Sequence, residues 1–111
     1  MEFGEIVVQA RVRIGLSQKE LAARLTKEDG TPISAQYLHD IEKGRRNPPT
    51  GPLLAQLARG LNLPEDYLRF AAGELPEDLR KGTFGPDQVL RAFGAMRREL
   101  GGPEDRERRE T

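Results

Sequence analysis

Residues 33–43 carry the side chains with the clearest capacity for chemistry in this chain of 111 residues. Leu38 and Ile41 are three residues apart, which places them on one face of a helix, and Ser34 is a residue type that caps a helix N-terminus. The opposite face then presents Ala35, Gln36, Tyr37, His39 and Asp40. Carboxamide, imidazole and carboxylate groups can pair with base edges in the major groove of DNA. The stretch is therefore predicted to be a recognition helix for nucleic acid.

A basic segment follows this predicted helix. Gly44 can adopt the left-handed backbone that ends a helix, and no acidic residue occurs between Glu42 and Glu65. The polar side chains of the segment are Lys43, Arg45, Arg46 and Asn47. A chain that leaves the groove crosses the sugar-phosphate backbone, so we expect these residues to contact phosphates, with Arg13 adding positive charge from an earlier helix.

Two earlier helices are predicted to position this one. Ser17 and Glu20 form a capping-box pattern, which starts a helix whose apolar face is Leu21, Ala22 and Leu25. Residues 3–15 place a second stripe at helical spacing, formed by Ile6, Val7, Ala10 and Ile14, and Gly15 ends it. Three amphipathic helices are thus expected to share one small core.

Two scaffold helices are predicted between residues 50 and 72. Thr50 can cap the first of them, with Pro52 in its first turn, and Pro64 can open the second. Their apolar positions are Leu53, Leu54, Leu57, Ala58, Leu61, Tyr67, Leu68 and Ala71.

Four segments together give the chain a recognisable pattern: residues 15–22 (GLSQKELA), 33–44, 47–49 (NPP) and 57–64. With them, residues 3–72 resemble the XRE family, the Cro and phage-repressor type of helix-turn-helix regulator. The resemblance implies an all-α domain of five helices that binds DNA, with Gln18 holding a phosphate and Gln36 reaching the bases. It also implies that Arg11 and Glu42 pair to fasten their two helices together.

The chain departs from the family pattern between the two central helices. Residues 26–32 form an insertion where the family has a short turn, and the Asp29-Gly30 turn pair and Pro32 predict a protruding loop. The loop is expected either to be solvated or to touch the phosphate backbone through Thr26 or Lys27.

Two residues of the recognition face keep alternative interpretations. Tyr37 either covers the edge of the core or contacts a phosphate or thymine methyl group. His39 is the only histidine, and the spacing of the carboxylates supplies no set of metal ligands around it. We therefore expect His39 on or beside the DNA face and predict no metal site and no cofactor.

The C-terminal third has a different composition. We assign residues 1–74 to the helix-turn-helix domain, 75–86 to a linker, 87–100 to another helix and 101–111 to a disordered charged tail. In the predicted helix, Val89, Phe93, Met96 and Leu100 recur every three or four residues. This apolar face is expected to pair with a second subunit or to pack on its own domain.

Composition narrows the function classes. The chain has no net charge, which counts against a strongly non-specific nucleic-acid binder. It has no cysteine and hence no disulfide framework. Its 36% apolar content suits one modest core. We expect no signal peptide and no membrane span, and therefore a cytoplasmic, nucleoid-associated protein. It lacks the paired nucleophile and base or the phosphate loop of an enzyme, so catalysis is not expected.

Two functional hypotheses follow from these patterns. The first is a sequence-specific regulator, a repressor that binds a palindromic operator in double-stranded DNA as a homodimer. The alternative is a protein-interaction module on the same fold, such as an antitoxin or an adaptor with a regulatory protein partner. The polar face at residues 35–40 favours the first, because a protein-binding groove usually exposes larger apolar side chains.

Overall fold

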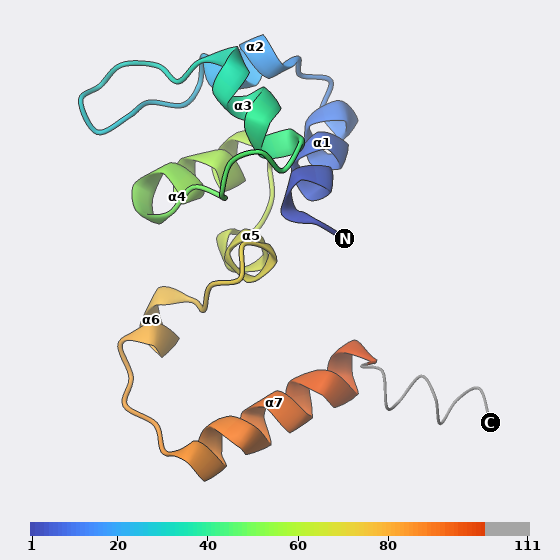
Figure 1. Cartoon of the computed structure of the whole chain (residues 1–111), viewed down its shortest axis with the longest axis vertical. Helices are drawn as coiled ribbons and strands as arrows, with labels where there is room; N and C mark the ends of the chain where they lie inside the picture. Colours follow the sequence, from blue (N-terminus) through green and yellow to red (C-terminus); the bar gives the residue numbers. More distant parts are fainter. Residues whose placement is uncertain (102–111) are drawn as a thin grey trace, which may run out of the picture. The chain divides into compact units, whose positions relative to one another are not determined.

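The computed structural model describes residues 1–101, which form two compact units, one of residues 1–80 and a second that begins at Lys81. Within the described residues the fold is entirely helical, apart from one isolated bridge (Figure 1). The helices are α1 (Phe3–Arg13), α2 (Gln18–Ala22), α3 (Ala35–Glu42), α4 (Gly51–Gly60), α5 (Glu65–Ala71), α6 (Glu77–Arg80) and α7 (Pro86–Leu100). The predicted all-α helix-turn-helix fold is confirmed.

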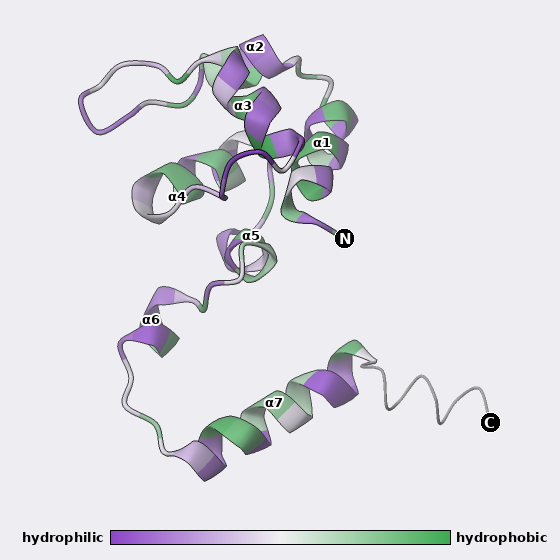
Figure 2. Cartoon of the chain, in the orientation of Figure 1, coloured by the Kyte–Doolittle hydropathy of each residue, from purple (hydrophilic) through white to green (hydrophobic). Residues whose placement is uncertain are grey.

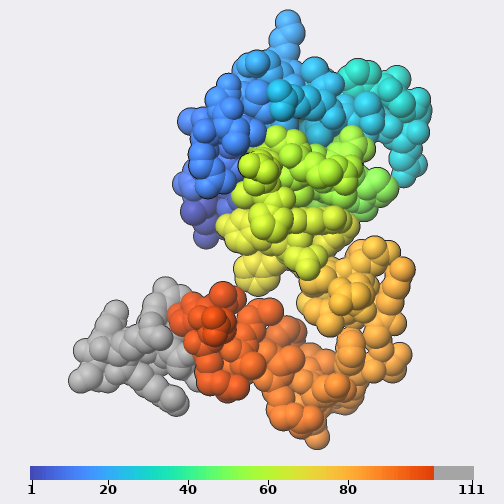
Figure 3. Space-filling model, turned by 180° about the vertical axis from the view of Figure 1, so that it is seen from behind, coloured from blue at the N-terminus to red at the C-terminus, as the bar shows by residue number. Residues whose placement is uncertain are grey.

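The first unit is built around a core to which each of α1–α5 contributes. Figure 2 shows hydrophobic and hydrophilic residues alternating around α1, α3 and α4, as amphipathic helices require. The side chains of the core that are almost wholly excluded from water are Val7, Leu21, Leu25, Leu38, Ile41, Leu54, Leu57, Leu61 and Leu68. On the face seen in Figure 3, α1, α4 and α5 lie against one another.

Local hydrogen bonds define the ends of the central helices. Ser17 Oγ accepts from the backbone N–H of Glu20 at 3.0 Å, and Glu20 Oε1 accepts from the backbone N–H of Ser17 at 3.1 Å, which completes the predicted capping box. Ser34 Oγ caps α3 by accepting from the N–H of Tyr37. Gly44 has a φ of 74° and ends α3 as predicted. Thr50 occupies the N-cap of α4, but its hydroxyl makes no capping hydrogen bond.

The start of α1 lies against the end of α3 with no side chain between them. A Cβ atom at Gly4 would lie 2.7 Å from the carbonyl oxygen of Ile41 and closer still to that of Glu42. Only glycine fits at this position without a backbone shift. The contact brings the positive end of the α1 dipole to the negative end of α3.

The insertion at residues 26–32 is an ordered hairpin. Thr26 and Pro32 form an antiparallel bridge, and Lys27 N–H donates to the carbonyl of Thr31 at 2.8 Å. Gln56 on α4 holds its base, since Oε1 accepts from Thr26 N–H at 2.9 Å and Nε2 donates to Thr26 C=O at 3.2 Å. The loop therefore has a fixed base and an exposed tip.

The segment assigned as a linker contains one turn of helix, which starts at Glu77. Pro76, a breaker by its residue type, instead precedes α6, and its carbonyl accepts from Leu79 and Arg80 N–H. Glu77 and Asp78 lie in the first turn and Arg80 in the last, which complements the helix dipole. Arg80 also lies 3.9 Å from Glu74, whose carboxylate meets the buried guanidinium of Arg69 at 3.5 Å.

In the second unit, α7 begins at Pro86, close to the predicted start, and ends at Leu100, where Gly101 forms the C-cap with a φ of 66°. Its large apolar side chains are exposed, with 64% of Leu90, 41% of Phe93, 40% of Met96 and 62% of Leu100 open to water. The rest of the predicted tail, residues 102–111, lies outside the described residues. None of the helices within residues 1–101 has the length and apolar character of a membrane span.

Candidate nucleic-acid interface

The recognition face predicted for α3 points away from the core. Leu38 and Ile41 are buried at 0% and 1% exposure, and α3 packs against both α1 and α2. Because these residues fix the rotation of the helix, Gln36 is exposed, while Ala35, Tyr37, His39 and Asp40 remain partly accessible. The predicted base-reading residues therefore lie on the accessible side of α3.

Gln36 and Asp40 lie one turn apart and are hydrogen-bonded to each other. Gln36 Nε2 donates to Asp40 Oδ1 at 3.0 Å. Such a pair at positions i and i+4 stabilises a helix by a few tenths of a kcal/mol, ~0.2–0.5. More important for recognition, the bond restricts the Gln36 side chain in the DNA-free protein.

Arg11 and Glu42 form the ion pair that the family resemblance implied. Arg11 Nε donates to Glu42 Oε2 at 2.8 Å and Nη2 donates to Oε1 at 3.0 Å, while Nη1 donates to the carbonyl of Leu16 at 2.8 Å. Hydrogen bonding to Glu42 raises the pKa of Arg11, so the guanidinium remains charged. The pair joins α1 to the end of α3 and thereby positions the recognition helix.

Gln18 belongs to the same polar cluster. Its Nε2 donates to Glu42 Oε1 at 3.0 Å and lies 3.5 Å from His39 Nδ1. Nε2, the donor group of this side chain, therefore lies among protein atoms. The phosphate role implied for Gln18 stays a prediction, and it requires Nε2 to be shared with Glu42 or released from it.

Tyr37 has neighbours that agree with both of its interpretations. Its ring packs against the edge of the core, and the Arg46 guanidinium lies over it, 4.8 Å from the ring centroid. Burial raises the pKa of the Tyr37 phenol, so the hydroxyl keeps its proton and can donate to a phosphate. This cation–π interaction joins α3 to the segment that follows it, residues 43–47, which we call the basic turn.

The basic turn itself is exposed. Lys43, Arg45, Arg46 and Asn47 are all open to water directly after α3. The structure does not bring Arg13 to this surface. Arg13 is two residues from Arg11, hence on nearly the opposite side of α1, where it lines a hollow with Leu63 and Tyr67.

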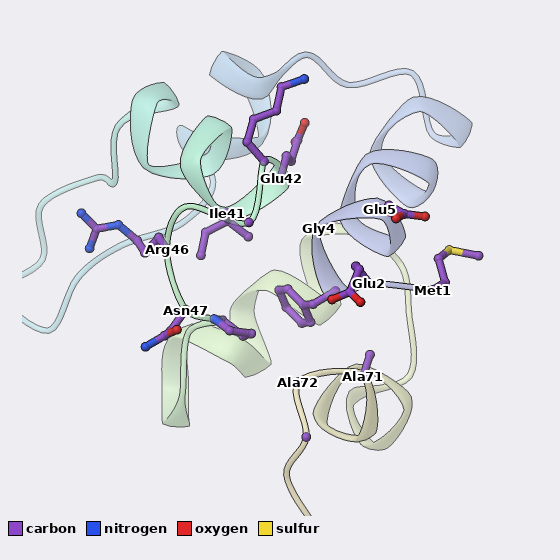
Figure 4. Close-up of a pocket in the computed structure, with 15 residues that line it drawn as sticks. Met1, Glu2, Gly4, Glu5, Ile41, Glu42, Arg46, Asn47, Ala71 and Ala72 are labelled. Carbon is purple, nitrogen blue, oxygen red and sulfur yellow. The ribbon is translucent and has the colours of Figure 1, made fainter.

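A hollow in this unit lies beside the basic turn (Figure 4). It has a volume of about 500 Å³ and lies between the first residues of α1, the end of α3 and the end of α5. Lys43, Arg46 and Asn47 line one side, and Glu2 and Glu5 line another. Opposite charges on its walls suit neither an anion nor a cation, and the residues predicted to read bases lie outside it. Binding through a projecting helix needs no such cavity.

Across residues 1–101, no three His, Asp or Glu side chains are grouped so that they could hold a metal ion. His39 has Gln18 as its polar neighbour.

Comparison with known proteins decides the family. A family model described as Helix-turn-helix matches residues 7–68, which include α2–α4 and most of α1 and α5. The chain belongs to the XRE and Cro type of helix-turn-helix family. This helix-turn-helix protein is accordingly a DNA-binding transcription regulator, and its domain is of a kind that is not typically enzymatic. No curated protein matches it.

Sequence reasoning on this helix-turn-helix protein missed three interactions. The Gln36–Asp40 bond had a signal in the sequence, because an amide and a carboxylate four residues apart meet on a helix. The stacking of Arg46 on Tyr37 and the hydrogen bond that the Gln18 amide donates to Glu42 had no such signal. They depend on how the turn folds back and on how α2 crosses α3, neither of which follows from residue spacing.

Proposed function

We propose that this protein is a repressor that binds a palindromic operator in double-stranded DNA as a homodimer. The observation that supports the proposal best is the accessible polar face of α3, which continues directly into the basic turn. Base-reading groups followed by phosphate-neutralising groups are the arrangement that a helix needs to enter the major groove.

Each side chain has a role in this proposal. Gln36, near the N-terminal end of α3, reads a base edge, and Ala35 can contact a thymine methyl group. Tyr37 and His39 flank the readers. Lys43, Arg45, Arg46 and Asn47 contact the phosphate backbone, which supplies affinity without sequence preference. Arg13, on the far side of α1, is left out.

Dimerisation is assigned to α7. Val89, Phe93, Met96 and Leu100 are separated by four, three and four residues, the alternation of a coiled-coil seam. Within the described residues this seam is largely open to water. A helix of 15 residues is about 22 Å long at ~1.5 Å per residue, so its own seam is short. Joint binding to two half-sites would strengthen the pairing through effective concentration.

Selection from a random pool of duplex DNA tests the proposal. The full-length protein should enrich an inverted repeat whose half-sites are about 10 base pairs apart, or a multiple of that spacing. A promoter carrying the enriched site should then be less active when the protein is present. Enrichment of a single, non-repeated site would contradict the dimer, and a more active promoter would contradict repression. No enrichment at all would favour the alternative, a protein-interaction module.

A further inference from the structure

Asp40 has a place on the recognition face that its charge alone does not explain. A carboxylate repels the phosphates of DNA, yet Asp40 lies one turn after the predicted base reader Gln36 and accepts its amide hydrogen bond. We propose that Asp40 is a positioning residue that fixes the Gln36 carboxamide and so selects adenine over guanine. This inference rests on the proposed function, because it concerns the bases that α3 reads.

The orientation of the Gln36 amide follows from the chemistry of its partner. The two atoms that meet, Nε2 and Asp40 Oδ1, are 3.0 Å apart. If the amide were turned over, Oε1 would face the carboxylate, and two acceptors would repel each other. Asp40 therefore holds the amide with its nitrogen towards the C-terminal end of α3 and its oxygen turned away.

This orientation determines what Gln36 can offer to DNA. One N–H group is used by Asp40, so one N–H donor and the Oε1 acceptor remain, side by side. Adenine presents an acceptor at N7 and a donor at N6, which matches this pair. Guanine presents acceptors at both N7 and O6, so Oε1 would face an acceptor. A Gln36 that rotates freely loses part of this discrimination.

The Asp40 carboxylate is available for the task. No ion pair within residues 1–101 involves it. The backbone carbonyl of Asp40 accepts from Arg45 N–H at 2.9 Å, which fixes the turn after α3 without using the side chain. The Asp40 side chain can therefore serve the bond to Gln36.

The proposal predicts that Asp40→Ala raises the affinity for all DNA but lowers the preference for adenine over guanine. Asp40→Ala removes a negative charge from the DNA-facing surface, so affinity for all DNA should rise. The same change frees Gln36, so the ratio of affinities for an operator with adenine and one with guanine at the Gln36 position should fall. A bidentate pair discriminates by about 5- to 150-fold, and we expect the ratio to drop by at least about 5-fold.

Anisotropy titrations with the full-length protein and the two operators test this. The Gln36 position is first identified as the one where Gln36→Ala loses preference. Asp40→Glu keeps a carboxylate that can only accept and should retain most of the wild-type ratio. Asp40→Asn can also donate to Gln36 Oε1 and so permits the turned-over amide, and it should lower the ratio as Asp40→Ala does. In the Gln36→Ala background, Asp40→Ala should change the ratio no further. Asp66→Ala is the matched control, because it removes an exposed carboxylate from α5 and should leave the ratio unchanged.

A second measurement needs no DNA. The Gln36 side-chain amide signals in a ¹⁵N–¹H spectrum should shift in Asp40→Ala and stay near their wild-type positions in Asp66→Ala. Unchanged Gln36 signals, or an unchanged base ratio in Asp40→Ala, would overturn the positioning role while leaving DNA binding intact. A wild-type protein that prefers no sequence would instead overturn the proposed function, and the assignment of Asp40 with it.

Discussion

Arg11 on α1 and Glu42 at the end of α3 meet at two points, 2.8 Å from Nε to Oε2 and 3.0 Å from Nη2 to Oε1. The Glu42 side chain is only 4% exposed and that of Arg11 14%. Gln18 also donates to Glu42, so one carboxylate connects α1, α2 and α3. The orientation of the recognition helix thus depends on a charge that is largely shielded from water.

Arg11→Ala should destabilise the fold strongly. It leaves Glu42 charged, buried and short of two donors, and breaking such a pair costs up to ~3–5 kcal/mol, less where water reaches it. Because Arg11 is partly accessible, we expect a loss of about 3 kcal/mol in the free energy of unfolding, measured by urea denaturation. Arg59→Ala, on the exposed side of α4, serves as the control and should change stability little.

The Arg11→Ala variant also distinguishes a structural role of the ion pair from a role in DNA contact. Its DNA binding should weaken at least in proportion to the unfolded fraction, because the pair also sets the orientation of α3. If Arg11→Ala is as stable as the wild type but binds DNA poorly, the pair is part of the DNA-contact surface rather than of the framework.

Gln36→Ala should affect recognition and change stability by no more than about 0.5 kcal/mol. Its side chain is exposed, and removing one bidentate interaction with a base costs roughly 1–3 kcal/mol of specific binding. Selection from a random pool should show relaxed preference at one position in each half-site. Equal decreases in affinity for specific and non-specific DNA would show that Gln36 does not read a base.

The sequence predicts most of this framework because the relevant signals are local. The Ser17–Glu20 capping box, the exit at Gly44 and the Leu38–Ile41 face each depend on residues a few positions apart. The Arg11–Glu42 pair spans 31 positions and could be expected only through family resemblance. Pairing at that distance is set by how helices cross, which residue spacing does not encode. The same reason explains why the polar cluster around Gln18 was missed.

Neutralising Arg45 or Arg46 should weaken binding to all DNA sequences alike. Removing one phosphate interaction should reduce the slope of log affinity against log salt by roughly 0.9. Arg45→Ala and Arg46→Ala should each show this change, measured by titration at several salt concentrations. Arg13→Ala should leave the slope unchanged, since the structure places Arg13 on the other side of α1. Unchanged slopes for both turn variants would indicate two solvated arginines.

A chain that ends at Lys81 should fold but bind its operator much more weakly. Residues 1–80 form a compact unit that holds every buried apolar core residue of the described chain, so removing α7 leaves the core intact. Light scattering should give a monomer for the shortened chain and a dimer for the full-length protein at tens of micromolar. A dimeric shortened chain, or a monomeric full-length protein, would contradict the role assigned to α7.

The Glu20 carboxylate should make the start of α2 sensitive to acid. Hydrogen bonds from the Ser17 backbone and side chain lower the pKa of Glu20 from 4.5. A carboxyl group whose pKa falls on folding stabilises the protein above its unfolded pKa, and this stabilisation is lost as the pH drops through the folded value. Glu20→Gln should therefore be less stable than the wild type at about pH 7, and thermal unfolding should show the gap narrowing as the pH falls below 4.5. A gap that persists in acid would rule out this charge effect.

The hairpin at residues 26–32 can change in length without changing the positions of the helices on either side of it. Ile33 N–H donates to the carbonyl of Leu25 at 3.1 Å, and the Gln56 amide secures Thr26, so the spacing of α2 and α3 is fixed below the tip. Each doubling of a flexible loop costs only ~0.6 kcal/mol of closure entropy. Extra residues inserted at Gly30 should therefore leave the recognition helix in place. The tip offers a permissive site for a fluorophore or affinity tag, and a position at which related chains can vary in length without changing how α3 is presented.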